Sequence, residues 1–441
     1  MDRNPQALDP AARELCAALR DAGFRALFAG GCVRDLLLGV APHDIDIATD
    51  ARPEQLMALF DNTLAVGARF GVVIVLRPEG AFEVATFRRD DCYSDGRHPD
   101  RVAFTDEVED ARRRDFTINA LFLDPETDAV LDYVGGVADL QAGVVRAVGD
   151  PDRRFGEDRL RLLRAVRFAA RLEYAVEPAT WAALCAQAPH IVETSPERIR
   201  DELLRVLTEG RARRAFELLD ASGLLQAVLP EVAAMKGVTQ PEAFHPEGDV
   251  FTHTLLALGQ LPEHVSPTLA LAVLLHDAGK PATWTKTDRI RFNRHEKVGA
   301  RLSEAVCRRL RLATRDVKRV AWLVENHMRL VHFFAMREHR RRRLARADGF
   351  DELLALCQID ALASHGDDRL CTAIAAWRDA MDAEQLAPPP LVTGHDLIAL
   401  GYRPGPLFRR ILDDIETRQL EGKLRDKAAA EAHIRRSYPL K

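Results

Sequence analysis

The chain has 441 residues, of which 47% are hydrophobic and 29% are charged, and its formal net charge is −5. This length exceeds one ordinary core and predicts two to four domains, while the composition excludes an intrinsically disordered chain. The net charge gives no overall sign of nucleic-acid binding, although local basic clusters can still form a phosphate-binding face. Because no apolar run reaches the ~20 residues of a membrane span, we expect no membrane partner.

The first 145 residues combine strand and helix patterns. Residues 9–22 predict a helix with Asp9 as its N-cap and Pro10 as its first helical residue. Expected strands cover residues 25–29 and 44–48, and residues 71–76 and 82–87 predict a hairpin. From about residue 153 helical periodicity dominates, with a helix start at Ser195–Pro196. The pattern predicts an α+β fold, a small mixed sheet with helices followed by an all-α body in sections.

Seven cysteines are scattered without a CxxC pair, and the N-terminal segment carries acidic residues and no apolar signal core. This spacing is typical of reduced, buried thiols and not of a disulfide framework or a zinc ribbon. Together these features predict a cytoplasmic protein. The sequence leaves open whether the chain forms a homodimer.

Two aspartates stand at i and i+2 in the stretch FAGGCVRDLLLGVAPHDIDIATD, which spans residues 28–50. On a strand, Asp44 and Asp46 would leave the same face about 6–7 Å apart, a separation at which two carboxylates hold Mg²⁺ together with substrate phosphates. Two such ions would clamp the attacking and leaving oxygens of a nucleotidyl transfer. The competing interpretation is a strand with its polar face in water.

The context favours a nucleotide site over a bare strand edge. Gly30, Gly31 and Arg34 precede the aspartates, and backbone N–H groups with a guanidinium suit a triphosphate. The pattern matches neither a P-loop nor a dinucleotide-binding fingerprint. Glu83, on a later expected strand, is a candidate third carboxylate, with a solvated glutamate as the alternative.

Two basic segments follow. Residues 112–121, RRRDFTINAL, place Arg114 and Asp115 before an expected amphipathic helix, and alone they read as a solvated charge run. Residues 154–168, RFGEDRLRLLRAVRF, would form one helix on which Glu157, Arg161 and Arg164 share a face. The simpler interpretation of this helix is a surface salt bridge between residues four apart.

A sharper interpretation of the second segment is base recognition. Asp158 would accept a hydrogen bond and Arg161 would donate one to the edge of a base. Cytosine and adenine offer an amino donor next to ring acceptors, whereas guanine and uracil place a carbonyl where the carboxylate needs a donor. One Asp/Arg pair could therefore accept C and A and reject G and U.

The motifs GGCVRD with DID, RRDFTINAL and EDRLRLLRAVRFAARL, in this order and spacing, resemble the class II tRNA nucleotidyltransferases of the polymerase-β superfamily. These are the CCA-adding enzymes and the bacterial poly(A) polymerase. The resemblance covers roughly the first half of the chain and implies a head, neck, body and tail, with tRNA, CTP and ATP as partners and Mg²⁺ as cofactor. It assigns these roles: Asp44 and Asp46 as catalytic Mg²⁺ ligands; Gly30, Gly31, Arg34, Arg114 and Asp115 as nucleotide-binding residues; Asp158 and Arg161 as the protein template, with Glu157 orienting Arg161 and Arg164 supporting the site.

The leading prediction is therefore a tRNA nucleotidyltransferase that adds CCA to tRNA 3′ ends. Residues 89–104 resemble the loop that such enzymes need to switch from C to A addition, and residues 66–72 look more like the tRNA enzymes than poly(A) polymerases. An A-adding enzyme or poly(A) polymerase remains the alternative in the same class. An HD phosphohydrolase with an RNA-binding head is the alternative from another class.

A second metal centre is predicted in the helical body. His253, His276–Asp277 and Asp360 follow the order H…HD…D, which resembles the HD phosphohydrolase superfamily and implies these four as metal ligands, Asp360 least securely. His295 and His327 would assist the metal or bind phosphate. Imidazoles and carboxylates from several helices can hold Ni²⁺, Mn²⁺ or Mg²⁺ and activate water. The resemblance implies phosphatase or 2′,3′-cyclic phosphodiesterase activity, with a purely structural domain as the alternative.

The motifs and the boundaries at residues 237–248 and 387–394, which are rich in proline and glycine, predict four segments. These are a head at 1–150, a helical neck and body at 151–240, an HD domain at 241–375 and a helical tail at 376–441. The basic run at residues 339–346, HRRRRLAR, is either a solvated face or a contact to tRNA phosphates. Lys423, Arg425 and Lys427 are weaker candidates, and His395–Asp396 predicts only a capping turn and a short helix.

Overall fold

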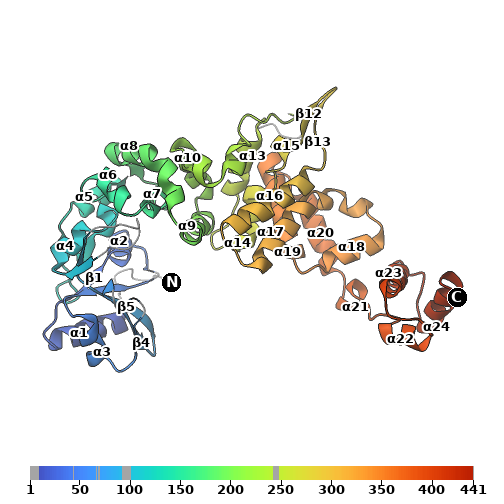
Figure 1. The fold of residues 1–441 in the computed structure, drawn as a ribbon, viewed down its shortest axis with the longest axis horizontal. Helices are drawn as coiled ribbons and strands as arrows, with labels where there is room; N and C mark the ends of the chain where they lie inside the picture. The colour runs from blue at the N-terminus through green and yellow to red at the C-terminus, as the bar shows by residue number, and fades with distance from the viewer. Residues whose placement is uncertain are drawn as a thin grey trace. The chain divides into compact units, whose positions relative to one another are not determined.

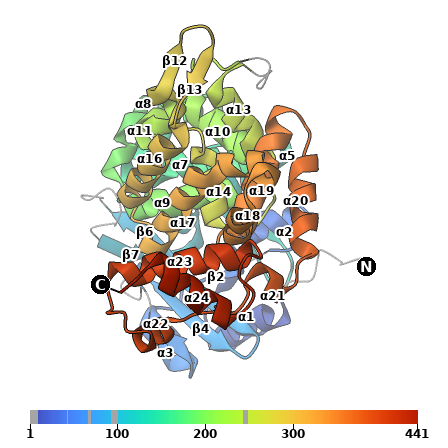
Figure 2. The same ribbon diagram turned by 90° about the vertical axis from the view of Figure 1, so that its right-hand side faces the viewer.

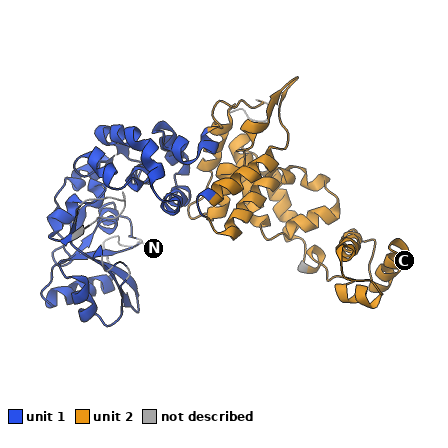
Figure 3. Ribbon diagram, in the orientation of Figure 1, with its two compact units in different colours: residues 1–233, 309–311 blue, residues 234–308, 312–441 orange. Residues whose placement is uncertain are grey.

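The computed structural model describes residues 9–42, 44–65, 67, 70–91, 101–241 and 248–440. It divides into two compact units, residues 1–233 with 309–311 and residues 234–308 with 312–441 (Figure 3). The first unit contains the large mixed sheet and the second is mainly helical, which confirms the α+β class (Figure 1). Among the helices of the described residues, none combines the length and the apolar character needed to cross a membrane.

A seven-stranded mixed sheet in the order β3-β4-β5-β2-β1-β8-β9 forms the centre of the first unit. The β2–β5 pair is parallel and the other neighbouring pairs are antiparallel. Leu27, Phe87 and Phe122 are buried in the core cluster under this sheet. The strands are β1 (Ala26–Ala29), β2 (Asp46–Thr49), β3 (Thr63–Leu64), β4 (Val72–Arg77), β5 (Gly80–Thr86), β8 (Leu121–Leu123) and β9 (Val130–Asp132).

The predicted first helix and hairpin are confirmed. The Asp9 carboxylate accepts a hydrogen bond from the Ala11 N–H at 2.9 Å, and Pro10 opens α1. Strands β4 and β5 form the expected hairpin. The remaining elements around the sheet are α1 (Pro10–Asp21), α2 (Gly31–Leu37), α3 (Pro53–Leu59), α4 (Glu107–Arg112), η2 (Thr117–Asn119), α5 (Gly136–Ala142) and the small hairpin β6 (Arg88–Asp91) with β7 (Arg101–Phe104). The predicted loop at 89–104 includes residues 92–100, which lie outside the described part, as do residues 66, 68 and 69.

Two predictions in the head are wrong. The strand predicted at residues 44–48 begins only at Asp46, because its neighbour β1 ends at Ala29, the partner of Asp46, where the chain turns at Gly30. Asp44 therefore lies in a bend before the strand. The amphipathic helix expected after Arg114 is a single 3₁₀ turn followed by β8, because the next residues are fully buried in the sheet against β1.

Helices follow the sheet to the end of the first unit. Helix α9 begins at Pro196 after Ser195, as predicted. The single helix predicted over residues 154–168 is wrong, since the chain is extended at Asp158 (φ −149°, ψ 106°), whose carboxylate accepts from the Leu160 N–H at 3.1 Å and so starts a new helix. The elements are α6 (Pro151–Glu157), α7 (Leu160–Arg171), α8 (Pro178–Gln187), η3 (Ala188–Glu193), α9 (Pro196–Thr208), α10 (Ala212–Ala221), α11 (Leu224–Val228), α12 (Pro230–Ala233) and the parallel pair β10 (Val144–Val145) with β11 (Ala175–Val176).

The second unit packs helices around α14, whose residues from Leu269 to Leu275 are all buried. The sequence analysis missed the hairpin β12–β13, whose three-residue strands are short and partly exposed. The elements are α13 (Val250–Gly259), α14 (Pro267–Leu275), α15 (Lys280–Thr283), β12 (Trp284–Lys286), β13 (Ile290–Phe292), α16 (His295–Arg309), α17 (Thr314–Asn326), η4 (His327–Ala335), α18 (Glu338–Ala345), α19 (Phe350–Ser364) and α20 (Arg369–Asp379).

The C-terminal helices have a small core of their own. Leu397, Ile411 and Ile434 are buried together, and their helices lie side by side (Figure 2). The predicted capping turn at His395–Asp396 is confirmed, because Thr393 and Asp396 cap α22 reciprocally. These elements are α21 (Ala383–Leu386), α22 (Gly394–Ala399), α23 (Pro406–Leu420) and α24 (Lys427–Ser437).

Candidate functional site

A cleft of about 510 Å³ opens at the edge of the sheet where β1 ends and β2 begins; we call it the head cleft. It brings together residues that are more than one hundred positions apart in the sequence. With the exception of Glu157, the predicted residues of the head and neck line it: Gly30, Gly31, Arg34, Asp44, Asp46, Glu83, Arg114, Asp115, Asp158, Arg161 and Arg164.

Three carboxylates stand on one wall of the head cleft. Asp46 pairs with Ala29 of β1 on one side and with Glu83 of β5 on the other, and Asp44 precedes it by two residues. Partial burial raises the pKa of Asp46, and the charge of Asp44 adds to this, although Arg114 opposes it. Loss of solvent in the cleft and the charge of Asp46 likewise raise the pKa of Glu83. The part of these pKa shifts that comes from neighbouring charge shows that the carboxylates repel one another when ionised. A divalent cation such as Mg²⁺, which binds carboxylate oxygens, would relieve this repulsion.

The turn at Gly30 requires glycine. Its φ is +75°, and a Cβ at this position would lie 2.6 Å from Nη1 of Arg114. Arg114 crosses the turn and donates hydrogen bonds to the Asn119 carbonyl oxygen at 3.0 Å and to the Asp110 carboxylate at 3.2 Å. The Gly30 backbone therefore lines the cleft beside the Arg114 guanidinium, which hydrogen bonds to Asn119 and Asp110 hold in place.

A chain of hydrogen bonds links Arg34 to Arg164, two of the arginines that line the cleft. Arg34 is 3% exposed and donates to the Asn119 side-chain oxygen at 2.5 Å, and the Asn119 amide donates to Asp115 at 3.2 Å. Asp115 in turn accepts from Nε of Arg164 at 2.7 Å. Burial raises the pKa of the Asp115 carboxyl, but Arg164 and Arg161 outweigh it and lower that pKa to about 2. Asp115 thus holds Arg164 in position, and Asn119 is a central residue that the sequence analysis did not select.

The two predicted base-reading side chains each have a partner of opposite charge. Arg161 donates to the Glu157 carboxylate at 2.8 Å and to the Arg154 carbonyl oxygen at 2.9 Å. Asp158 accepts two hydrogen bonds from Arg198 of α9, at 2.9 and 2.8 Å. The sequence analysis placed Glu157 behind Arg161, but it did not identify Arg198.

Further basic residues line the head cleft that the sequence analysis did not select. Arg167, Phe168 and Arg171 follow Arg164 on α7 at offsets of three, four and seven residues, so helical spacing from Arg164 could have identified them. Arg113 directly precedes Arg114 in the segment RRRDFTINAL, whereas Arg88 and Arg205 come from distant elements that no local pattern marks. The additional basic residues are Arg88, Arg113, Arg167, Arg171 and Arg205, and Phe168 lines the cleft with them.

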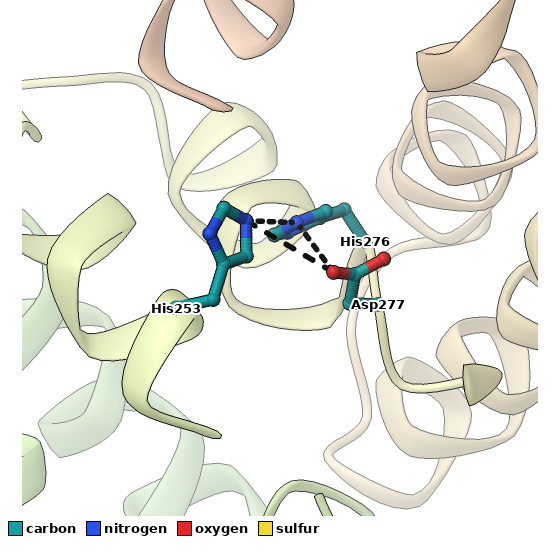
Figure 4. A group of neighbouring side chains, drawn as sticks. All are labelled: His253, His276 and Asp277. Atoms are coloured by element: carbon teal, nitrogen blue, oxygen red, sulfur yellow. Dashed lines mark hydrogen bonds and ion pairs between the residues drawn. The ribbon is translucent and has the colours of Figure 1, made fainter. Parts of the chain in front are cut away.

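The second unit contains a buried cluster that we call the histidine centre: His253, His276, Asp277, His295, His327 and Asp360. His253, His276 and Asp277 point toward one another (Figure 4), with ligand atoms within 4.8 Å of one another. The ligand atoms of Asp277, His295 and His327 also lie within 4.8 Å of one another. Oδ1 of Asp360 lies 2.9 Å from Nε2 of His253. The structure thus brings together all six predicted residues, and the two triads share Asp277.

The histidine rings are oriented as metal ligands. In three of them Nδ1 lies within hydrogen-bond distance of a carbonyl oxygen three residues earlier. Because a carbonyl oxygen can only accept, Nδ1 carries the proton and Nε2 presents a lone pair. The Nε2 atoms of His295 and His327 face each other at 3.2 Å, where two lone pairs repel unless a cation lies near both. The rings are those of His276, His295 and His327.

The charge states also suit metal binding. Burial lowers the pKa of His327 to about 4, with the charge of His276 acting in the same direction. Burial alone would raise the pKa of Asp277, but Lys280 and His276 hold it well below its usual value. Neutral imidazoles and an ionised carboxylate are the forms that bind divalent metals.

The HDAGK segment passes very close to the start of α16. A Cβ on Gly279 would lie 2.1 Å from the carbonyl oxygen of His295. Only glycine permits this approach, which places His276 and Asp277 on the segment beside His295.

The basic run at residues 339–346 is largely paired within its own unit. Arg343 and Arg346 both form ion pairs with Glu416 of α23, and Arg342 pairs with Glu338. Two of the weaker candidates near the C-terminus are paired as well, Lys423 with Glu421 and Lys427 with Asp396. The ion pairs of this run therefore connect α18 to α23, an arrangement that the sequence did not predict.

Three family models match three consecutive segments of the chain. Residues 26–146 match the model of the poly A polymerase head domain, residues 173–236 that of the probable RNA and SrmB-binding site of polymerase A, and residues 250–363 that of the HD domain. The mixed sheet with its acidic edge is thus a nucleotidyltransferase head, and the histidine centre belongs to an HD domain.

Curated relatives identify the family. The CCA-adding enzyme of Levilactobacillus brevis is 33% identical over 416 residues, 94% of this chain and 94% of the relative. The CCA-adding enzyme of Leuconostoc mesenteroides is 44% identical over 208 residues, which cover 47% of this chain and 52% of the relative. The structure of the Bacillus stearothermophilus CCA-adding enzyme in complex with CTP has a TM-score of 0.76 and 27% identity, covering 98% and 99% of the two chains. The chain belongs to the CCA-adding enzyme family of tRNA nucleotidyltransferases.

Proposed function

We propose that the head cleft adds C, C and A to the 3′ end of tRNA, using CTP and ATP. The observation that carries this proposal is the register of the sheet, in which Asp46 lies between the end of β1 and Glu83, in one cleft with Asp158 and Arg161. The cleft thus brings cation ligands together with groups that would bind phosphate and read a base.

Asp44 and Asp46 would hold Mg²⁺, with Glu83 as a further oxygen donor. When bound, Mg²⁺ favours ionisation of the attacking 3′-hydroxyl and neutralises charge on the leaving pyrophosphate. Asn119 accepts hydrogen bonds from Arg34 and Arg114, whose guanidinium groups would bind the triphosphate. Guanidinium groups held in this way would position the phosphates before reaction occurs.

Base selection would rest on Asp158 and Arg161. The Asp158 carboxylate accepts a hydrogen bond from the amino group of cytosine or adenine, and Arg161 donates to the ring acceptor beside it. Arg164, held by Asp115, supports the position of this pair. Uracil and guanine present a carbonyl to the carboxylate, so neither base forms that hydrogen bond.

The alternative of A-only or poly(A) addition is disfavoured by the relatives, because those reported above are CCA-adding enzymes. Incubation of tRNA that lacks CCA with CTP alone, ATP alone and both nucleotides separates the possibilities. We expect two nucleotides from CTP alone and three from the mixture. Absence of incorporation from CTP would reject CCA addition, and a long A tail would indicate a poly(A) polymerase.

A second activity is favoured by the histidine centre, which would act as a metal-dependent phosphohydrolase. Asp277 has one oxygen 3.3 Å from Nε2 of His276 and the other 3.6 Å from Nε2 of His295, so it stands between the two triads. We propose that each triad would hold one divalent ion such as Ni²⁺, Mn²⁺ or Mg²⁺, with Asp277 as a member of both triads. When bound, such ions lower the pKa of water and bind a phosphate oxygen. A phosphomonoester or a 2′,3′-cyclic phosphodiester is the proposed substrate class.

The four segments at 1–150, 151–240, 241–375 and 376–441 remain our proposal for how these tasks divide along the chain. The first and second would carry nucleotide addition, the third hydrolysis and the fourth a helical tail. A cytoplasmic location stays a prediction from the sequence, and the sequence leaves open whether the chain forms a homodimer. Gel filtration with light scattering would measure the oligomeric state directly.

A further inference from the structure

We propose that Arg198 is a positioning residue, which fixes the direction of the Asp158 carboxylate and thereby sets the preference for C and A over U and G. The inference rests on the proposed function, because it deepens the account of base selection in the same cleft. Arg198 lies on α9, forty residues from its partner, and it is not among the residues that line the head cleft. It would therefore act through Asp158 and not by touching the base.

The contact has the geometry of a rigid clamp. Nη1 of Arg198 donates to Oδ1 of Asp158 at 2.9 Å and Nη2 donates to Oδ2 at 2.8 Å. Two parallel hydrogen bonds between planar groups fix the plane of the carboxylate as well as its position. The side chains are only 22% and 16% exposed, so solvent screens this pair less than a surface pair.

Asp158 needs such a clamp because its backbone is not part of a helix. It lies at the break between α6 and α7, where the chain is extended. Without Arg198, the remaining hydrogen bond shown from a described residue to this carboxylate comes from the Leu160 N–H at 3.1 Å. A single bond of this kind leaves the carboxylate free to rotate, whereas the bidentate pair does not.

The clamp also leaves room for one further donor. A carboxylate accepts about four hydrogen bonds, and described residues supply three to Asp158, two from Arg198 and one from Leu160. The remaining acceptor direction is therefore defined by Arg198. An amino group of cytosine or adenine can fill it, and a carbonyl of uracil or guanine cannot.

Arg161 has an equivalent support. The Glu157 carboxylate accepts a hydrogen bond from the Arg161 guanidinium at 2.8 Å, and Glu157 does not line the cleft. It holds Arg161 as Arg198 holds Asp158. Each base-reading side chain is thus held from behind by a residue of opposite charge. The two supports come from different elements, α6 and α9, so one can be removed without the other.

The test is a double-mutant cycle on base choice. Purified full-length chains carrying Arg198→Ala, Asp158→Ala or both changes are given tRNA lacking CCA and single nucleotides, and kcat/KM is measured for CTP and UTP. We expect Arg198→Ala to lower the CTP/UTP ratio by about 10- to 100-fold, the discrimination that a bidentate contact provides. In the Asp158→Ala background Arg198→Ala should change the ratio by less than about twofold.

Arg198→Lys keeps the charge but cannot form two parallel hydrogen bonds, so we expect an intermediate ratio. Arg213→Ala is the matched control, since Arg213 forms an exposed pair with Glu217 outside the cleft. A thermal melt shows that each variant is folded, and Arg198→Lys carries the test if Arg198→Ala does not fold. An unchanged ratio in Arg198→Lys, or an equal loss in the Asp158→Ala background, would overturn the proposal. Failure of the unaltered chain to use CTP would instead reject the proposed function.

Discussion

Asp46 of β2 lies directly opposite Glu83 of β5, in the parallel pair of an otherwise antiparallel sheet. Neighbouring strands are about 4.8 Å apart, so the two carboxylates are close enough to share a cation. Loss of solvent and the charge of Asp46 raise the pKa of Glu83, so a nearby cation would favour its ionised form. The register of the sheet thus adds a third oxygen donor to the two supplied by the DID motif.

Glu83→Gln tests this third donor. Removal of one carboxylate charge should raise the Mg²⁺ concentration needed for half-maximal nucleotide addition by about 10- to 100-fold, a typical effect of weakened metal support. The measurement is the rate of CTP incorporation across a Mg²⁺ titration. Glu14→Gln, on the exposed side of α1, is the control with the same change of charge. A Mg²⁺ dependence equal to that of the unaltered chain would remove Glu83 from the metal site.

The buried pair of Asp115 and Arg164 should show in acid. The folded-state pKa of Asp115 is about 2, below its ordinary value of 3.8, so its stabilising contribution is present above pH 3.8 and is lost as pH falls toward 2. Between pH 6 and pH 3 the difference in unfolding free energy between the unaltered chain and Asp115→Asn should shrink by about 1 kcal/mol.

Urea unfolding measures this difference when fluorescence reports on the first unit alone. Trp181 lies in that unit, so the other three tryptophans are replaced by phenylalanine in every chain compared. Asp128→Asn, in an exposed pair with Arg13, is the control for removal of one carboxylate charge from the same unit. A constant difference for Asp115→Asn would show that its carboxyl is not stabilised by Arg164.

The sequence predicted the parts of the head cleft that are local. GGCVRD, DID and the Glu157–Arg161 pair each lie within a few residues, and their spacing places them correctly even though the helix boundaries were wrong. Arg198 and the register of Glu83 depend on how distant elements pack, which no local pattern encodes. The break at Asp158 was missed because its residues have helical spacing, while the chain is extended there and the Asp158 carboxylate accepts from the Leu160 N–H at the start of α7.

In the second unit, we expect binding of both proposed metal ions to require Asp277, which belongs to both triads, and binding of one of them to require His327. Dialysis against Mn²⁺ or Ni²⁺ followed by mass spectrometry of the metal should give about two ions per unaltered chain, about one in His327→Ala and fewer than one in Asp277→Asn. His332→Ala, on the exposed side of η4, should retain both. Equal metal content in His327→Ala and the unaltered chain would contradict the shared-carboxylate arrangement.

The basic run on α18 should act on the tail and not on tRNA. Since Arg343 and Arg346 are paired with Glu416, their replacement by alanine should increase hydrogen exchange in α23. The KM for tRNA should change by less than about twofold, because these charges are already neutralised. Arg340→Ala, at an exposed position of the same helix, is the control for α23 protection. A large rise in the KM for tRNA would restore the earlier hypothesis of a phosphate contact.

We expect nucleotide addition to occur at the three carboxylates of the head cleft, independently of the histidine centre. The most direct measurement compares Asp46→Asn with the unaltered full-length chain in two assays, CTP and ATP incorporation into tRNA lacking CCA, and hydrolysis of a 2′,3′-cyclic phosphodiester. Loss of a metal-binding carboxylate should reduce incorporation by at least about 1,000-fold, while hydrolysis stays within about twofold. Incorporation that survives Asp46→Asn would contradict the account.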